Sequence, residues 1–158
     1  MTIAYREFLA TKMSVTISKM VSDDALSLAK IDEVVFGGSF KENDFLSYID
    51  SDIYYFHVAK IDEKAVGYIG YMIIAGEADI INVGILPEYR GNGIGNMLMD
   101  AMIDECKKNS VTCVHLEVRK SNFVAISMYE KYGFIVVGTS KNHYKDPTED
   151  ALRMNLHL

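Results

Sequence analysis

The chain has 158 residues, a length typical of a single domain, and we expect one domain over residues 1–158. It is 49% hydrophobic and 24% charged, as in ordinary globular proteins, and no apolar run approaches the roughly 20 residues needed to span a membrane. The net charge of −6 disfavours direct nucleic-acid binding and suits a basic partner.

The N-terminal residues 1–13 ("MTIAYREFLATKM") contain no uninterrupted apolar segment like that of a secretory signal, so we expect a cytoplasmic protein. We expect this piece to be an extension outside the core fold. Cys106 and Cys113 lack the spacing of metal ligands, and the histidines show none either, so no metal site is predicted. Both cysteines are expected to be small apolar core residues in a reducing compartment.

A short strand over residues 15–17 and two helices are predicted first. The first helix is expected to start at Ser22, a good capping residue followed by acids. Its buried face is predicted to contain four apolar residues: Leu26, Ala29, Ile31 and Val34. The segment "FGGS" ends this helix, and Ser39 is expected to cap a second helix through "KENDFLSYI".

The middle of the chain changes to strand-like segments rich in β-branched and aromatic residues: "IYYFHVAKI", "AVGYIGYMII" and "ADIINVGIL". The residues "DEK" between the first two are typical of a tight turn, and Pro87 ends the third. These segments predict an antiparallel meander.

A glycine-rich segment and a helix to about Asn109 come next. One apolar stripe runs along this helix: Met99, Met102, Ile103 and Cys106. The strand "TCVHLEV" follows, and because a helix connects it to the preceding strand, we expect the two strands to be parallel. A second helix, "SNFVAISMYEKYG", is expected to be capped by Ser121 or Asn122 and to stop at Gly133.

Two strands, "FIVVGTS" and the alternating tail "ALRMNLHL", complete the chain. The tail is expected to place four apolar residues on one face: Leu152, Met154, Leu156 and Leu158. The order β-α-α-β-β-β-α-β-α-β-β predicts an α/β (α+β) protein with a mixed central sheet of six to seven strands and helices on both faces.

Three glycines stand at alternate positions directly before the long helix: Gly91, Gly93 and Gly95. A Rossmann fingerprint is excluded by this spacing and by the antiparallel strands before it, and a P-loop is excluded because Asn96 and Met97 stand where Lys and Ser/Thr are needed. An ordinary flexible turn remains. The other interpretation is a pyrophosphate cradle, in which backbone amides and the helix N-terminus bind a diphosphate with Arg90 at its edge.

The segment "NVGILPEYRGNGIG" resembles the Q/R-x-x-G-x-G/A acetyl-CoA motif of the GNAT N-acetyltransferases. "LEVRKSNFVAISMYEKYGF" and the tail "NHYKDPTEDALRMNL" resemble the GNAT subgroup that acetylates the N-terminal alanine of a small-subunit ribosomal protein, the RimI type. The similarity extends from about Thr16 to the C-terminus. It implies the GNAT fold, in which the central strands splay apart at the cofactor site.

The resemblance implies acetyl-CoA as co-substrate. Three residues are expected to bind the pantetheine arm through their backbone, like an added strand: Val83, Gly84 and Ile85. The pyrophosphate is expected to lie against the loop and the first turn of the helix: Arg90, Gly91, Asn92, Gly93, Ile94, Gly95 and Asn96. Asn122 is expected to contact the cofactor from the start of the second helix, a role compatible with capping.

By the same resemblance, Glu117 matches the general base and Tyr129 the general acid. An amine that attacks the thioester is mostly protonated near neutral pH, so a carboxylate must take a proton, while a phenol supplies the leaving thiolate with a proton or a hydrogen bond. The amide of Ile85 is expected to hold the oxyanion. From the residues alone, Glu117 can instead pair with Arg119, Tyr129 can be a core aromatic, and His115 is a proton relay or a structural histidine.

Two segments depart from the subgroup's pattern. "FGGSF" replaces a usual Pro-Trp-Ser beside the peptide-binding side, and "NHY" stands where two adjacent tyrosines are usual, which matches Tyr144 and leaves the role of His143 open. The prediction is acetylation of a protein N-terminal α-amine, with a ribosomal protein beginning with alanine as the first substrate, by a monomer or weak dimer that does not bind membranes. A small amine or a lysine side chain as acceptor, and a catalytically silent acyl-CoA-binding module, are the alternatives.

Overall fold

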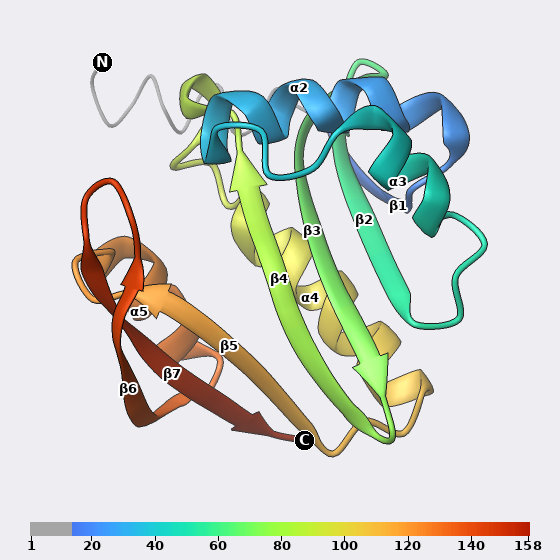
Figure 1. Cartoon of the computed structure of the whole chain (residues 1–158). Coiled ribbons are helices and arrows are strands. Elements are labelled where there is room, and N and C mark those ends of the chain that lie inside the picture. Colours follow the sequence, from blue (N-terminus) through green and yellow to red (C-terminus); the bar gives the residue numbers. More distant parts are fainter. Residues whose placement is uncertain (1–13) are drawn as a thin grey trace. The chain divides into compact units, whose positions relative to one another are not determined.

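The computed structural model describes residues 14–158, so the predicted N-terminal extension lies outside the described residues. Strands and helices follow one another in the predicted order (Figure 1). The elements are β1 (Val15–Lys19), α2 (Ala25–Phe36), α3 (Glu42–Tyr48), β2 (Tyr54–Ile61), β3 (Lys64–Ile74), β4 (Glu77–Ile85), α4 (Ile94–Lys108), β5 (Cys113–Arg119), α5 (Phe123–Lys131), β6 (Ile135–Tyr144) and β7 (Glu149–His157).

The strands form one seven-stranded mixed sheet in the order β1-β2-β3-β4-β5-β7-β6. β1 and β2 are antiparallel, β4 and β5 are parallel, and β7 is antiparallel to both β5 and β6. This confirms the predicted parallel pairing across α4. The ladder between β4 and β5 holds three residue pairs and ends at Asp79 and His115, so β4 continues beyond it through Ile85.

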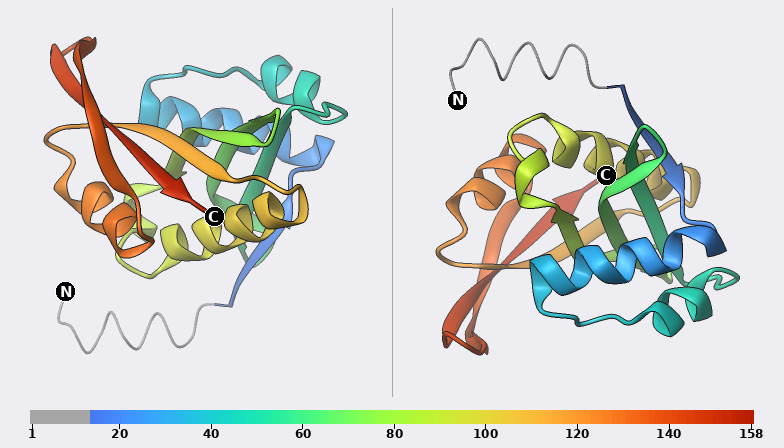
Figure 2. Two further views of the ribbon diagram at one scale, coloured as in Figure 1. Left: turned by 90° about the horizontal axis from the view of Figure 1, so that it is seen from below. Right: turned by 90° about the horizontal axis from the view of Figure 1, so that it is seen from above.

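The described residues divide into two compact units. The first contains residues 14–71 and 82–104, and the second contains residues 72–81 and 105–158. In the first unit, α2 and α3 lie on one face of β2 and β3, and the first part of α4 lies on the opposite face (Figures 1 and 2). Its core is aromatic: the Phe45 ring makes edge contacts with Phe40, Phe56 and Tyr68.

The predicted cap of the first helix was wrong, and its predicted buried face was half right, since Ile31 is buried and Ala29 packs against the core. Ser22 begins a 3-10 turn and does not cap α2, while the Asp24 carboxylate accepts from the Val21 amide at 2.9 Å. Two residues assigned to the core are exposed, Leu26 at 49% and Val34 at 61%. The buried face contains Ala25, Leu28, Ile31 and Asp32. Because a hydrophobic pattern places aspartate on the solvent side, it puts the apolar face of this helix partly in the wrong direction.

Ser39 was predicted to cap α3, but it does not. That helix begins at Glu42, where the Lys41 amide donates to Oδ2 of Asp44 at 2.7 Å. The Ser39 hydroxyl donates instead to both oxygens of Asp32, at 2.9 and 3.0 Å. The side chain that looked like a local cap therefore makes a tertiary contact between the loop and α2.

In the second unit, Cys106 and Cys113 are both buried, as predicted. Of the two proposed caps of α5, Asn122 is the residue whose Oδ1 accepts from the Ala125 amide. Gly133 follows this helix with a left-handed φ of 97°. Among residues 14–158, no helix has the length and apolar character needed to cross a membrane.

Candidate functional site

The glycine segment of the first unit connects a 3-10 turn, Pro87–Tyr89, to the start of α4 at Ile94. Gly91 and Gly93 have left-handed φ angles of 77° and 78°, which glycine adopts without strain. A Cβ placed at either position would meet no atom within 4 Å. The backbone of this loop is therefore open on the sides where other residues would carry a side chain, directly before a helix N-terminus.

Two polar side chains fix this loop from within. Arg90 Nε donates to the Ile85 carbonyl at 3.0 Å, and Asn92 Nδ2 donates to the Tyr89 carbonyl at 3.0 Å. Arg90 is exposed, and a guanidinium carries four further N–H donors. The predicted cation at the edge of the cradle is thus anchored to the end of β4.

The end of β4 is held on one edge by β3. The Leu86 amide donates to the Val66 carbonyl at 2.9 Å, and a Cβ on Gly67 would lie 2.9 Å from the Gly84 carbonyl. Gly67 is therefore needed for the close approach of the two strands. Gly84 and Ile85, which are expected to bind pantetheine, therefore lie next to the glycine loop, and the bond from Arg90 to Ile85 connects the two segments.

In the second unit, Glu117 lies on β5 opposite Arg153 of β7. Its side chain is 38% exposed, and Oε2 lies 2.7 Å from Nε2 of His143. Arg119 was the alternative partner of Glu117. Its Nη1 instead lies 3.4 Å from Oε1 of Glu149, and its guanidinium carbon lies 4.4 Å from the centroid of the Tyr144 ring. The carboxylate predicted to be the base is therefore paired with a histidine.

Tyr129 is buried in α5, with its ring centroid 5.7 Å from that of Phe134. Burial, and to a smaller extent Tyr144, raise the pKa of Tyr129 to about 12. Burial also raises the pKa of Tyr144, with the negative charge of Glu117 as the second cause. Tyr144 is thus electrostatically coupled to both predicted catalytic groups, Glu117 and Tyr129, within one unit.

Two other predicted residues are engaged in structural contacts. His115 Nδ1 lies 2.8 Å from Oδ1 of Asn155, and its Nε2 lies 3.6 Å from Oε2 of Glu77, which supports its interpretation as a structural histidine. Asn122 is exposed and caps α5, so its contact with a cofactor stays a prediction. Within residues 14–158 there is no cluster of three or more His, Cys, Asp or Glu suited to a metal ion.

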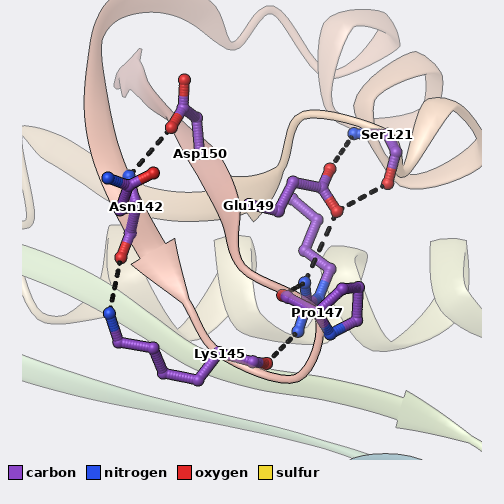
Figure 3. A network of polar contacts seen from close by, with 7 residues as sticks. Ser121, Asn142, Lys145, Pro147, Glu149 and Asp150 are labelled. Atoms are coloured by element: carbon purple, nitrogen blue, oxygen red, sulfur yellow. Dashed lines mark hydrogen bonds and ion pairs between the residues drawn. The ribbon is translucent and has the colours of Figure 1, made fainter.

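The contact between His143 and Glu117 was missed by sequence reasoning. His143 lies near the end of β6, and the hairpin that follows is fastened by a polar network around Glu149 (Figure 3). Neither the spacing nor the hydrophobic pattern indicates this contact, because the two residues are 26 positions apart on strands that are not neighbours. The departure of "NHY" from two tyrosines was the one signal present in the sequence.

Comparisons with known proteins agree with the resemblance to the GNAT acetyltransferases. Residues 25–134 match a family described as "Acetyltransferase (GNAT) family". A Bacillus subtilis protein with the provisional name [ribosomal protein bS18]-alanine N-acetyltransferase is 35% identical over 114 residues, 72% of this chain and 76% of that protein. The Escherichia coli protein named [ribosomal protein bS18]-alanine N-acetyltransferase is 30% identical over 145 residues, 90% of this chain and 97% of its own.

Solved structures extend the similarity to the fold. The crystal structure of the Escherichia coli ribosomal-protein-S18-alanine N-acetyltransferase has a TM-score of 0.82 at 29% identity and covers 91% of this chain and 94% of its own. Arabidopsis thaliana Naa50, in complex with the bisubstrate analogue CoA-Ac-MVNAL, has a TM-score of 0.78 at 25% identity, with 92% and 99% covered.

Proposed function

This chain belongs to the acetyltransferase (GNAT) family, and we propose that it transfers the acetyl group of acetyl-CoA to the N-terminal α-amine of a protein. The first candidate substrate is a ribosomal protein that begins with alanine. The observation that carries the proposal is the similarity to the Escherichia coli enzyme of that specificity over 90% of this chain. The net charge of −6 suits the basic N-terminus of a ribosomal protein.

Acetyl-CoA is expected to bind through the backbone of the glycine loop. The left-handed Gly91 and Gly93 carry no side chains that would cover their amides, and the N-terminus of α4 adds a partial positive charge. Arg90 supplies a cation beside them. The pantetheine arm would lie along the end of β4 at Val83–Ile85, beyond the ladder with β5.

In the reaction, the amine nitrogen attacks the thioester carbonyl carbon, a C–N bond forms and the C–S bond breaks. Glu117 takes one proton from the amine and passes it to solvent, while the CoA thiolate takes up one proton from solvent, which gives an amide and a thiol. We assign Tyr129 to hydrogen bonding of the leaving sulfur. Burial raises the pKa of Tyr129, which keeps its hydroxyl protonated and able to donate to the sulfur.

The proposal is tested by incubating the protein with acetyl-CoA and one of three acceptors: a ribosomal N-terminal peptide beginning with alanine, the same peptide with a blocked α-amine, and a polyamine. Intact mass reports a gain of one acetyl group. We expect a gain with the free peptide only. Acetylation of the blocked peptide or the polyamine alone would overturn the N-terminal assignment, and tight acetyl-CoA binding without any turnover would make the chain a binding module.

A further inference from the structure

We propose that His143 is a positioning residue for Glu117, brought to it by an irregularity in β6. The inference rests on the proposed function, in which Glu117 is the base. The regular sheet does not place the two residues together. Glu117 pairs with Arg153 on β7, and Arg153 pairs with Gly138 on β6. The β6 residue in register with Glu117 is therefore Gly138, five positions before His143.

The irregularity lies between two regular pairs of β6 and β7, Ser140–Ala151 and Tyr144–Glu149. Residues 141–143 of β6 therefore face a single residue of β7, Asp150. Such a bulge locally bends a strand and re-aims its side chains. In this one, Asn142 has a left-handed φ of 51°, and its amide donates to Oδ1 of Asp150 at 2.8 Å.

The hairpin beyond the bulge is fastened to the end of β5 (Figure 3). The Glu149 carboxylate accepts from the Ser121 amide at 2.7 Å and from its hydroxyl at 2.9 Å. Arg119 donates to the carbonyls of Pro147 and Lys145, at 3.1 and 3.2 Å. Because Arg119 is two residues from Glu117 on the same strand, the fastening sets the position of the hairpin relative to Glu117.

The contact itself has a defined direction. A carboxylate is an acceptor only, so Nε2 of His143 must carry the hydrogen and donate to Oε2 of Glu117 across 2.7 Å. The Glu117 side chain is 38% exposed, and without this partner it would be free to take several rotamers. His143 thus holds one carboxylate oxygen in place and leaves the other to take the proton of the incoming amine.

A double-mutant cycle tests whether His143 acts through Glu117, with turnover and acetyl-CoA affinity measured on the full chain. We expect His143→Leu to lower kcat about tenfold and to change the Kd of acetyl-CoA less than about twofold. We expect His143→Gln, whose amide keeps an N–H donor, to recover most of the loss. In a Glu117→Gln background, His143→Leu should have no further effect on kcat.

The outcomes separate this inference from the proposed function. Wild-type kcat in His143→Leu, or the same tenfold loss in the Glu117→Gln background, would overturn the inference while Glu117 stays the base. Wild-type kcat in Glu117→Gln would remove the base from the proposed function, and the inference with it. His157→Leu, at the other end of β7 opposite Cys113, is the control and should keep wild-type kcat. If His143→Leu does not fold, His143→Asn replaces it, since the shorter amide does not reach Glu117.

Discussion

The Tyr68 hydroxyl donates to Oδ2 of Asp32 over 2.7 Å, and both side chains are fully buried. Asp32 also accepts from the Ser39 hydroxyl and from the Phe40 amide, the latter at 3.0 Å. Burial and the bond to Asp32 raise the pKa of Tyr68. The carboxylate thus ties together α2, β3 and the loop "FGGSF", whose sequence departs from the subgroup.

We expect Tyr68→Phe to lower the free energy of unfolding by about 1.5–3 kcal/mol, because it removes a hydrogen bond to a buried charge. Urea denaturation measures the change. Tyr55→Phe is the matched control, since the Tyr55 hydroxyl makes an exposed 3.4 Å contact with the Asp52 carbonyl, and we expect it to change stability by less than about 0.5 kcal/mol. Equal losses in the two variants would contradict the role of Asp32 as a buried anchor.

Gly93→Leu is expected to abolish acetyl-CoA binding in calorimetry, because the side chain would occupy the space assigned to the phosphates. Gly37→Leu is a closely matched control. Gly37 has a φ of 76° against 78° for Gly93, and neither position has an atom within 4 Å of an added Cβ. Both variants therefore carry the same left-handed strain, of about 1–2 kcal/mol. Retained binding in Gly93→Leu would make the glycines an ordinary turn.

Tyr129→Phe removes the hydroxyl that we assign to the leaving sulfur. Loss of one hydrogen bond made in the transition state is expected to lower kcat about 100-fold. The Kd of acetyl-CoA should change much less, because the bond strengthens only as the sulfur becomes charged. Steady-state kinetics and calorimetry separate the two effects. A Tyr129→Phe enzyme with unchanged kcat would leave Tyr129 as a core aromatic only.

The protonation state of Glu149 is expected to affect the stability of the protein, because its carboxylate accepts hydrogen bonds that hold the hairpin. Hydrogen bonds from Ser121 first, and then Arg119, lower the pKa of Glu149 below its ordinary 4.5. A carboxyl with a lowered folded pKa stabilises the fold above pH 4.5, and the contribution is lost as the pH falls through the folded value. We therefore expect wild type to exceed Glu149→Gln in unfolding free energy at pH 5–7, with a difference that shrinks below pH 4.5. A difference independent of pH would contradict the network in Figure 3.

The element order could be predicted because helices and strands in this chain have clear apolar periods. The errors arose where polar side chains act over a distance. Ser22 and Ser39 look like local caps, but Asp24 and Asp32 are the acceptors of the contacts that form there. The buried Asp32 also moved the core face of α2 away from Leu26, since no hydrophobic pattern places a carboxylate in a core.

The candidate site was predictable where a local motif defines it. The glycine loop and the Asn122 cap depend on neighbouring residues, and the structure shows the left-handed glycines and the cap. The partner of Glu117 was not predictable, because it depends on a bulge in β6 and on a hairpin fastened from β5. Arg119, two residues away, was the partner that the sequence suggested, but it forms its ion pair with Glu149 instead.

The central claim is that the acceptor is an N-terminal α-amine. The most direct measurement uses one ribosomal N-terminal peptide that begins with alanine and also contains an internal lysine, incubated with acetyl-CoA and this protein and then fragmented in a mass spectrometer. We predict that the acetyl group is found on the N-terminal residue and that the lysine is unmodified. An acetyl group on the lysine side chain with a free N-terminus would contradict the account.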